Sequence, residues 1–241
     1  MEKIIAETNQ LLNIKLSPHQ VSQLKHYQQE LEKWNEHYSL TAIRDPEKVR
    51  VKHFLDSFSC RLVMDHLAGK RIIDIGTGAG FPGLPLKILS PETGVTVVDS
   101  VKKKVEFCQH IVKKLDLDGV GVIRERAERL GQDLGHREQY DWAVARAVAQ
   151  LPELAEYLLP LVKRGGFMLA MKGESGPAEA QQSMAVIDLL GGELSQVKKL
   201  TLPGVAEDRY LIVVQKMVST PEKFPRRVGI PSKRPLHSTL D

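Results

Sequence analysis

The run RIIDIGTGAGFPG, residues 71–83, joins an apolar strand sequence to a glycine-rich turn. Residues 72–75 read as a strand buried on both faces, since only Asp74 among them is polar. Gly76 and Gly78 allow a tight turn in which backbone N–H groups approach a ligand, and Pro82 suits the first turn of a following helix. The run therefore predicts a nucleotide-like cofactor site at the end of a buried strand.

The spacing of these glycines differs from that of dinucleotide-binding enzymes. They fall as G-x-G-x-G, and Phe81 stands where the fingerprint G-x-G-x-x-G has its third glycine. An acidic residue two places before the first glycine, with no third glycine at the helix start, is typical of S-adenosylmethionine enzymes. We therefore expect S-adenosylmethionine rather than a pyrophosphate ligand. The alternative is an ordinary strand-to-helix turn.

A second carboxylate follows the next apolar strand. Residues 95–98 read Val-Thr-Val-Val and are followed by Asp99 and Ser100, with Asp99 lying 23 residues after Gly76. A carboxylate at this place in a βαβ unit can accept hydrogen bonds from the ribose hydroxyls of an adenosine. The alternative is that Asp99 caps the helix predicted from Val101, and the two roles are compatible.

Composition excludes several classes of protein. The 241 residues, 42% of them hydrophobic, suffice for one large domain or for a core domain with an appendage. The N-terminus is charged and no segment approaches 18 uninterrupted apolar residues, so we expect no membrane segment. Cys60 and Cys108 form no disulfide framework, and the scattered histidines form no metal-ligand pattern. We therefore expect a cytoplasmic protein without a metal.

The basic charge lies at the C-terminus. From Lys216 onwards six lysines and arginines stand against two acidic residues, which accounts for the whole net charge of +4. Four prolines between residues 221 and 235 prevent a long helix or a central strand there. This tail predicts a basic arm that lies along RNA phosphates, and the alternatives are a solubilising extension or a segment packed on the body.

The remaining pattern predicts a doubly wound α/β fold with a mostly parallel seven-stranded, Rossmann-like sheet. Helices are expected at 3–12, from Pro18 to about Tyr38, and from Pro46 to about Leu67. Strands then alternate with helices, and the last two strands follow each other directly. We divide the chain into an N-terminal helical extension (1–68), a core expected to bind S-adenosylmethionine (69–217) and a Pro-rich basic tail (218–241). The expected strands are 71–75, 95–99, 120–123, 141–145, 167–171, 194–201 and 209–216, and the expected later helices lie near 82–89, 101–115, 127–131, 150–163 and 177–190.

Charged side chains follow three of these strands. Ligands of such sheets bind at the carboxyl ends of the strands, so Arg126, Arg146 and Lys172 are expected on one rim. Arginine there can hold phosphate or carboxylate bidentately. Glu128 or the backbone around Ala127 can bond the adenine edge. The alternative is that these charges are solvated surface groups.

Six segments together resemble the bacterial ribosomal RNA small subunit methyltransferase G family, also called glucose-inhibited division protein B. The block His53-Phe54-Leu55-Asp56-Ser57, combined with the Gly76 turn, is the most specific part of the resemblance. The six segments are 34–35, 40–46, 52–57, 74–83, 146–147 and 169–173.

The resemblance implies methyl transfer from S-adenosylmethionine to N7 of a guanine in the decoding-region loop of 16S rRNA, usually numbered 527. It implies cofactor contacts at Gly76, Phe81, Asp99-Ser100, Ala127-Glu128 and Arg146, to which the turn adds Gly78. We assign His53, Arg126 and Lys172 to positioning of the RNA or its target base, with no general base. The expected partner is 16S rRNA or the small ribosomal subunit, and we expect a monomer.

The chemistry of guanine N7 agrees with what the sequence lacks. Methylating a ring carbon usually requires a Cys nucleophile, and neither cysteine is expected at a strand end. The N7 lone pair is already available, so alignment and exclusion of water are the main tasks. N7 lies in the narrow major groove of A-form RNA, so we expect an unstacked loop base as the target. Two alternatives are an NAD-dependent oxidoreductase, which Phe81 disfavours, and a non-catalytic RNA-binding or ribosome-assembly factor.

Overall fold

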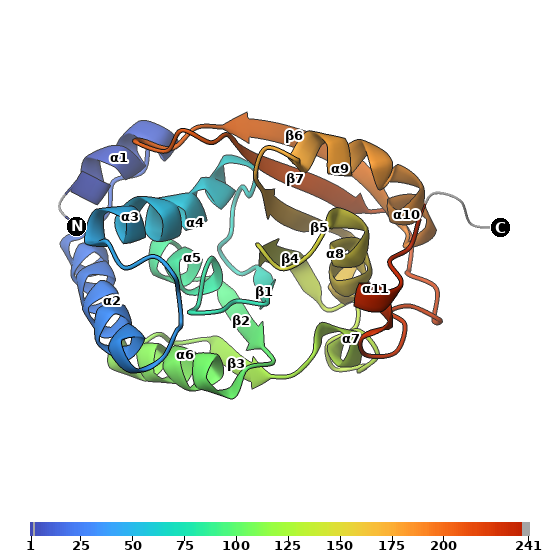
Figure 1. The fold of residues 1–241 in the computed structure, drawn as a ribbon, viewed down its shortest axis with the longest axis horizontal. Coiled ribbons are helices and arrows are strands. Elements are labelled where there is room, and N and C mark those ends of the chain that lie inside the picture. The colour runs from blue at the N-terminus through green and yellow to red at the C-terminus, as the bar shows by residue number, and fades with distance from the viewer. Residues whose placement is uncertain (2, 238–241) are drawn as a thin grey trace.

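A computed structural model describes residue 1 and residues 3–237, and a seven-stranded sheet forms its centre (Figure 1). The strand order is β3-β2-β1-β4-β5-β7-β6. β7 runs opposite to the other six strands and pairs antiparallel with β5 and β6. The predicted doubly wound, mostly parallel sheet is confirmed. The strands are β1 (Arg71–Ile75), β2 (Gly94–Asp99), β3 (Val120–Arg124), β4 (Tyr140–Arg146), β5 (Val162–Lys172), β6 (Gly192–Leu200) and β7 (Arg209–Lys216).

Helices cover both faces of this sheet, because successive side chains of each strand point to opposite sides. Ile72 belongs to one hydrophobic cluster, and its neighbour Ile73 belongs to the other. The first cluster is covered mainly by N-terminal helices, α5 and α6, and the second by α8 and α10. The main helices are α1 (Lys3–Leu12), α2 (Pro18–His37), α5 (Gly83–Leu89), α6 (Lys102–Lys114), α7 (Ala127–Leu130), α8 (Leu151–Leu158), α9 (Gly176–Gln182), α10 (Met184–Leu189) and α11 (Ile230–Lys233).

The helix expected from Pro46 to about Leu67 is shorter and less regular than predicted. It comprises α3 (Pro46–Val49), a π-helix (Arg50–Leu55), α4 (Asp56–Phe58) and a 3-10 helix (Ser59–Leu62). The hydroxyls of Ser57 and Ser59 donate to the carbonyls of His53 and Asp56, at 2.5 and 2.6 Å. Such side-chain bonds compete with the regular helical ladder, and they lie where the helical pattern changes.

Three other elements differ from the prediction. β5 begins at Val162, five residues early, and its register with β4 shifts between Tyr140 and Trp142. The helix expected over 177–190 is divided at Ser183, whose hydroxyl donates to the Glu179 carbonyl at 2.6 Å. The last turn of the helix expected over 150–163 is a 3-10 helix (Leu159–Leu161).

The N-terminal helices are joined to the core at the glycine-rich turn. The buried Tyr27 of α2 donates its hydroxyl to the Ala79 carbonyl at 2.5 Å, and its ring stacks on Phe81 at 5.2 Å. A β-carbon at Gly80 would lie 2.2 Å from the Tyr27 hydroxyl oxygen, so only glycine allows this approach. The helical extension therefore packs directly on the predicted ligand turn.

We predict that Tyr27→Phe destabilises the protein by about 1 to 2 kcal/mol, because the buried Ala79 carbonyl loses its donor while the ring is kept. Urea unfolding measures the change. Tyr38→Phe is the matched control, since Tyr38 is 38% exposed. Equal stability of both variants and the wild type would contradict the proposed anchoring role.

Candidate functional site

A cavity of about 360 Å³ lies at the carboxyl ends of β1, β2 and β3. We call it the first cavity. Carboxylates outnumber cations along it, with Asp99, Glu125, Glu128 and Glu153 against two basic side chains. Of the predicted cofactor residues, the structure brings Gly76, Asp99, Ser100, Ala127 and Glu128 to this cavity.

The floor of the first cavity is the glycine-rich turn, which the buried carboxylate of Asp74 holds in place. Its Oδ2 accepts hydrogen bonds from Thr77 Oγ1 at 2.6 Å and from the Gly83 N–H at 2.8 Å. Burial raises the pKa of Asp74 to about 6, although these two bonds oppose the shift. Asp74 therefore shapes the turn and does not itself line the cavity.

Asp99 lines the first cavity, and its carboxylate also bonds to two backbone N–H groups. One carboxylate oxygen accepts the Gly78 N–H at 3.0 Å and the other accepts the Val101 N–H at 2.9 Å, next to the start of α6. A carboxylate has about four acceptor positions, so capacity for ribose hydroxyls remains. Gly78 donates to Asp99 but does not itself line the first cavity.

The opposite wall of the first cavity is formed by α7. Glu128 is buried there and accepts the Gly229 N–H at 2.8 Å, while Arg126 lies 3.5 Å from the same oxygen. Arg126 thus lines the first cavity, whereas its place after a strand was expected to direct it to the RNA. A neighbouring hydroxyl, that of Tyr157, donates to Glu153 at 2.6 Å.

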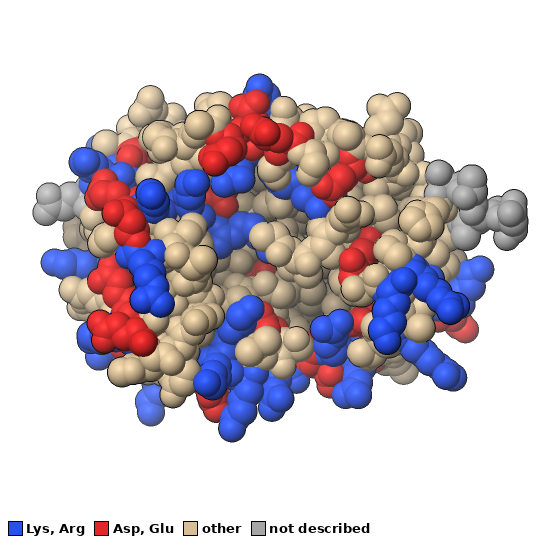
Figure 2. Space-filling model, in the orientation of Figure 1, with Lys and Arg blue, Asp and Glu red and all other residues tan. Residues whose placement is uncertain are grey.

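A second cavity of about 310 Å³ adjoins the first, and Ala147 lines both. It contains His53, Arg146 and Lys172, which come from the π-helix and from the ends of β4 and β5. Figure 2 draws one face of the molecule, with lysine and arginine side chains in and around a hollow at its centre. The rim of cations predicted from the strand ends is therefore divided between two adjoining cavities.

His53 is held in one orientation by bonds at both ring nitrogens. An Arg146 guanidinium nitrogen lies 3.2 Å from Nδ1, and Thr41 Oγ1 lies 2.9 Å from Nε2. Since the guanidinium only donates, Nδ1 accepts and Nε2 carries the proton. Burial, with Arg146 as a second cause, lowers the pKa of His53 to about 3, so the ring is neutral at working pH.

Arg146 lies in the second cavity and does not line the first, where the resemblance had placed it as a cofactor contact. Its guanidinium donates to Asp56 at 2.8 Å and to the Lys52 carbonyl at 3.0 Å. Phe81, a second expected cofactor contact, has its side chain in the hydrophobic core. Its ring stacks on His53 at 4.6 Å and so supports the second cavity from below.

Lys172 and Arg209 differ in the bonds that their side chains make within the protein. Lys172 donates to Glu179 at 2.6 Å and to the Ala149 carbonyl at 2.6 Å. Arg209 also lines the second cavity, and among the described residues it has no ion-pair partner and a buried Nε without an acceptor. Charges that follow strands did not predict Arg209, because it begins the antiparallel strand β7 at the same edge of the sheet.

The described residues, 1 and 3–237, contain no group of His, Cys, Asp and Glu that could hold a metal ion. In the same part of the chain, no helix is both long enough and apolar enough to cross a membrane. Cys60 and Cys108 are buried, and burial raises the pKa of both thiols well above its usual range. Neither side chain is therefore suited to act as a thiolate nucleophile.

The family model of GidB, described as rRNA small subunit methyltransferase G, matches residues 20–211. The chain belongs to this family. Two relatives named ribosomal RNA small subunit methyltransferase G support the assignment. That of Desulfitobacterium hafniense (strain Y51) is 44% identical over 229 residues, with 95% of each chain covered. That of Roseiflexus castenholzii is 49% identical over 223 residues, covering 92% of this chain and 94% of the relative.

Solved structures agree with the GidB assignment at the level of the fold. A SAM dependent methyltransferase from Aquifex aeolicus has a TM-score of 0.53 and 17% identity, covering 70% of this chain and 93% of that chain. TrmN from Thermus thermophilus has a TM-score of 0.53 and 19% identity, covering 70% and 53%. The family resemblance seen in the sequence is confirmed.

We predict that Asp74→Asn changes the pH dependence of stability. The raised pKa means that the folded state binds the proton more tightly, so the wild type loses stability as pH rises from about 4 to about 6. Asparagine keeps an acceptor without the buried charge. Relative to the wild type, its free energy of unfolding should therefore gain up to about 3 kcal/mol over this range.

Urea unfolding at several pH values between 4 and 7 tests the prediction. Asp65→Asn removes an exposed carboxylate and serves as the control. Parallel pH dependences for Asp74→Asn and the wild type would show that the buried carboxyl group does not titrate as expected.

Proposed function

We propose that this protein is an S-adenosylmethionine-dependent methyltransferase that modifies N7 of the 16S rRNA guanine usually numbered 527. Family membership supports the enzyme class, and the resemblance noted in the sequence supports the base and its position. The observation that carries the proposal is the pair of cavities that adjoin at Ala147. One suits a cationic nucleoside and the other offers hydrogen-bond donors to a base.

The first cavity fits S-adenosylmethionine by charge. Its excess of carboxylates favours a sulfonium and ribose hydroxyls over a pyrophosphate, which argues against a dinucleotide. Asp99 would accept the ribose hydroxyls, and Glu128 and the Ala127 backbone would lie along the adenine. When bound, the cofactor would supply an electrophilic methyl group on sulfur.

The second cavity fits a reaction that needs no general base. Both nitrogens of His53 are engaged within the protein, and its lowered pKa keeps the ring neutral. Guanine N7 has a lone pair and loses no proton when it is methylated. His53 would therefore act by holding Arg146 in place, and Arg146 and Lys172 would orient the base. Arg209 would contact RNA through its unpaired guanidinium.

The loop after β4 separates the two reactants. Ala147 has a positive φ of 54°, and Lys172 bonds to the Ala149 carbonyl two residues later. This loop would set the distance and direction of approach between N7 and the methyl group, which is where most of the rate acceleration is expected. We further propose that the protein acts in the cytoplasm as a monomer on 16S rRNA or the small ribosomal subunit.

We predict that cells lacking this gene lose the methyl group at one guanine of 16S rRNA, and that a plasmid copy restores it. Mass spectrometry of digested 16S rRNA locates the modified nucleotide. An unchanged methylation pattern would leave a non-catalytic RNA-binding or ribosome-assembly factor as the better description.

We predict that Asp99→Ala and Lys172→Ala separate cofactor binding from base positioning. Asp99→Ala should weaken affinity for S-adenosylmethionine about tenfold or more, because an acceptor for both the ribose and the Gly78 N–H is lost. Lys172→Ala should keep that affinity and lower the methylation rate. Calorimetry and single-turnover methylation measure the two quantities.

Asp118→Ala, an exposed carboxylate beyond α6, is the control for Asp99→Ala. A normal methylation rate in Lys172→Ala would remove Lys172 from the positioning residues. Normal cofactor affinity in Asp99→Ala would remove the proposed ribose contact.

A further inference from the structure

The C-terminal segment, residues 218–237, packs on the body next to the first cavity. Phe224 is 4% exposed and Leu236 is 7% exposed, and both belong to the hydrophobic cluster that contains α8. Pro225 lies against Gly131, where an added β-carbon would be 2.6 Å away. The segment is therefore seated on the two helices, α7 and α8, that form one wall of the first cavity.

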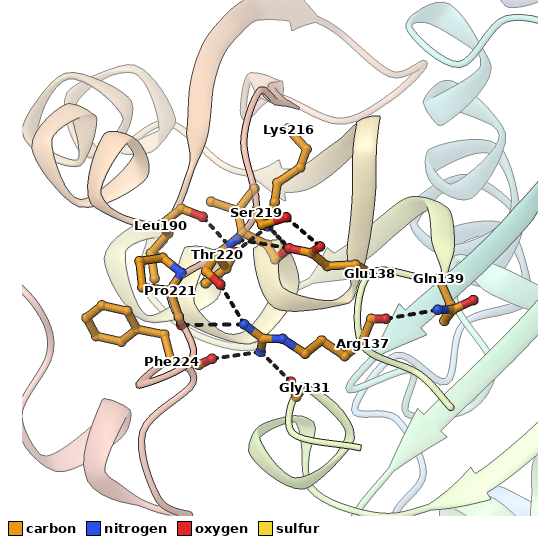
Figure 3. A network of polar contacts seen from close by, with 11 residues as sticks. Gly131, Arg137, Glu138, Gln139, Leu190, Lys216, Ser219, Thr220, Pro221 and Phe224 are labelled. Atoms are coloured by element: carbon orange, nitrogen blue, oxygen red, sulfur yellow. Dashed lines mark hydrogen bonds and ion pairs between the residues drawn. The ribbon is translucent and has the colours of Figure 1, made fainter. Parts of the chain in front are cut away.

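Arg137 fixes the beginning of this segment through backbone carbonyls (Figure 3). Its guanidinium donates to Thr220 at 2.7 Å, to Phe224 at 2.8 Å and to Gly131 at 2.7 Å. One arginine thus joins the segment to Gly131, the residue that follows α7. On the other side of Thr220, Glu138 accepts the Thr220 N–H at 2.9 Å.

Arg226 fixes the middle of the segment to α8. The Glu156 carboxylate is fully buried and accepts the Arg226 backbone N–H at 2.8 Å, Nε at 2.9 Å and a terminal nitrogen at 2.6 Å. This is a bidentate pair with an additional backbone bond, the strongest class of such contacts. Without Arg226, the Glu156 carboxylate would be buried and unpaired, which is strongly unfavourable.

The end of the segment reaches the first cavity itself. The Gly229 N–H donates to the buried Glu128 at 2.8 Å, and Ser232 of α11 lines the cavity mouth. Gly229 has a φ of 80°, which directs the chain into α11 at this point. The C-terminal segment therefore orients one cavity carboxylate and supplies part of the opening.

We propose that the C-terminal segment is a wall of the cofactor cavity and that its docking through Arg226 sets the affinity for the nucleoside part of the cofactor. This inference rests on the proposed function, because it takes S-adenosylmethionine as the ligand of the first cavity. Undocking would release the Gly229 N–H from Glu128 and remove Ser232 from the mouth. The part of the first cavity that is proposed to hold the adenine would then be open to solvent.

The charge distribution along the segment favours this role over that of a free RNA-binding arm. The Arg226 guanidinium is paired with Glu156. Arg227, the next residue, is exposed and has no ion pair among the described residues. Substitution of Arg227 is therefore a suitable control for substitution of Arg226. Each arginine carries one positive charge, but of the two only Arg226 is paired with the body of the protein.

Calorimetry with S-adenosylmethionine on the full chain tests the proposal. Arg226→Ala should weaken affinity about tenfold, because the docked wall is lost, and Arg227→Ala should stay within about twofold of the wild type. Ser232→Leu places a larger side chain at the mouth and should also weaken binding. Lys233→Leu is its control, since the neighbouring Lys233 does not line the cavity.

The outcomes distinguish this inference from the proposed function. No binding by the wild type would overturn both. Binding by the wild type, with unchanged affinity in Arg226→Ala and Ser232→Leu, would overturn the inference alone. If Arg226→Ala and Arg227→Ala equally weaken binding of an rRNA fragment and spare the cofactor, the segment is an RNA-binding arm. Should Arg226→Ala unfold, as shown by circular dichroism, Ser232→Leu still decides.

Discussion

The buried carboxylate of Asp74 is the constraint on which both cavities depend. It connects the end of β1 to the Thr77 hydroxyl and to the first N–H of α5, and so fixes the turn that forms the cavity floor. A β-carbon at Gly83 would lie 2.9 Å from the Asp74 oxygen, so glycine is needed for this close approach. Burying the charge has a cost, which the raised pKa records.

Aromatic packing carries this fixed geometry from the turn to the second cavity. The Tyr27 ring stacks on Phe81, Phe81 stacks on His53, and the Arg146 guanidinium lies over Phe81 at 5.4 Å. Phe81 stands where a dinucleotide-binding turn has its third glycine. Its packing against these side chains gives it a structural role as well. The residue that disfavours a dinucleotide also supports the side chains that line the second cavity.

Local sequence patterns predicted the parts of the fold that depend on local physics. The apolar strands, the glycine turn and the proline-marked helix starts depend on neighbouring residues, and all seven strands lie where expected to within a few residues. The π-helix around His53 was not predicted, because the apolar spacing that marks a helix does not reveal its hydrogen-bond pattern. Arg126 and Arg146 both follow strands, and only the packing of Glu128 and Asp56 beside them assigns each to its cavity. The position of the C-terminal segment depends on long-range contacts, such as Arg226 with Glu156 and Arg137 with the Thr220 carbonyl, which sequence proximity does not reveal.

The electrostatics of the two cavities also bear on the direction in which charge moves in the proposed reaction. Methyl transfer to N7 turns a neutral base into a cation, so an uncompensated group of arginines and lysines around the base would oppose it. The protein offsets this field, because Asp56 pairs with Arg146 at 2.8 Å and Glu179 pairs with Lys172 at 2.6 Å. The donors keep their directions while their charges are largely neutralised. Arg209, which also lines the second cavity, has no ion-pair partner among the described residues, and an uncompensated guanidinium would suit an RNA phosphate better than the base.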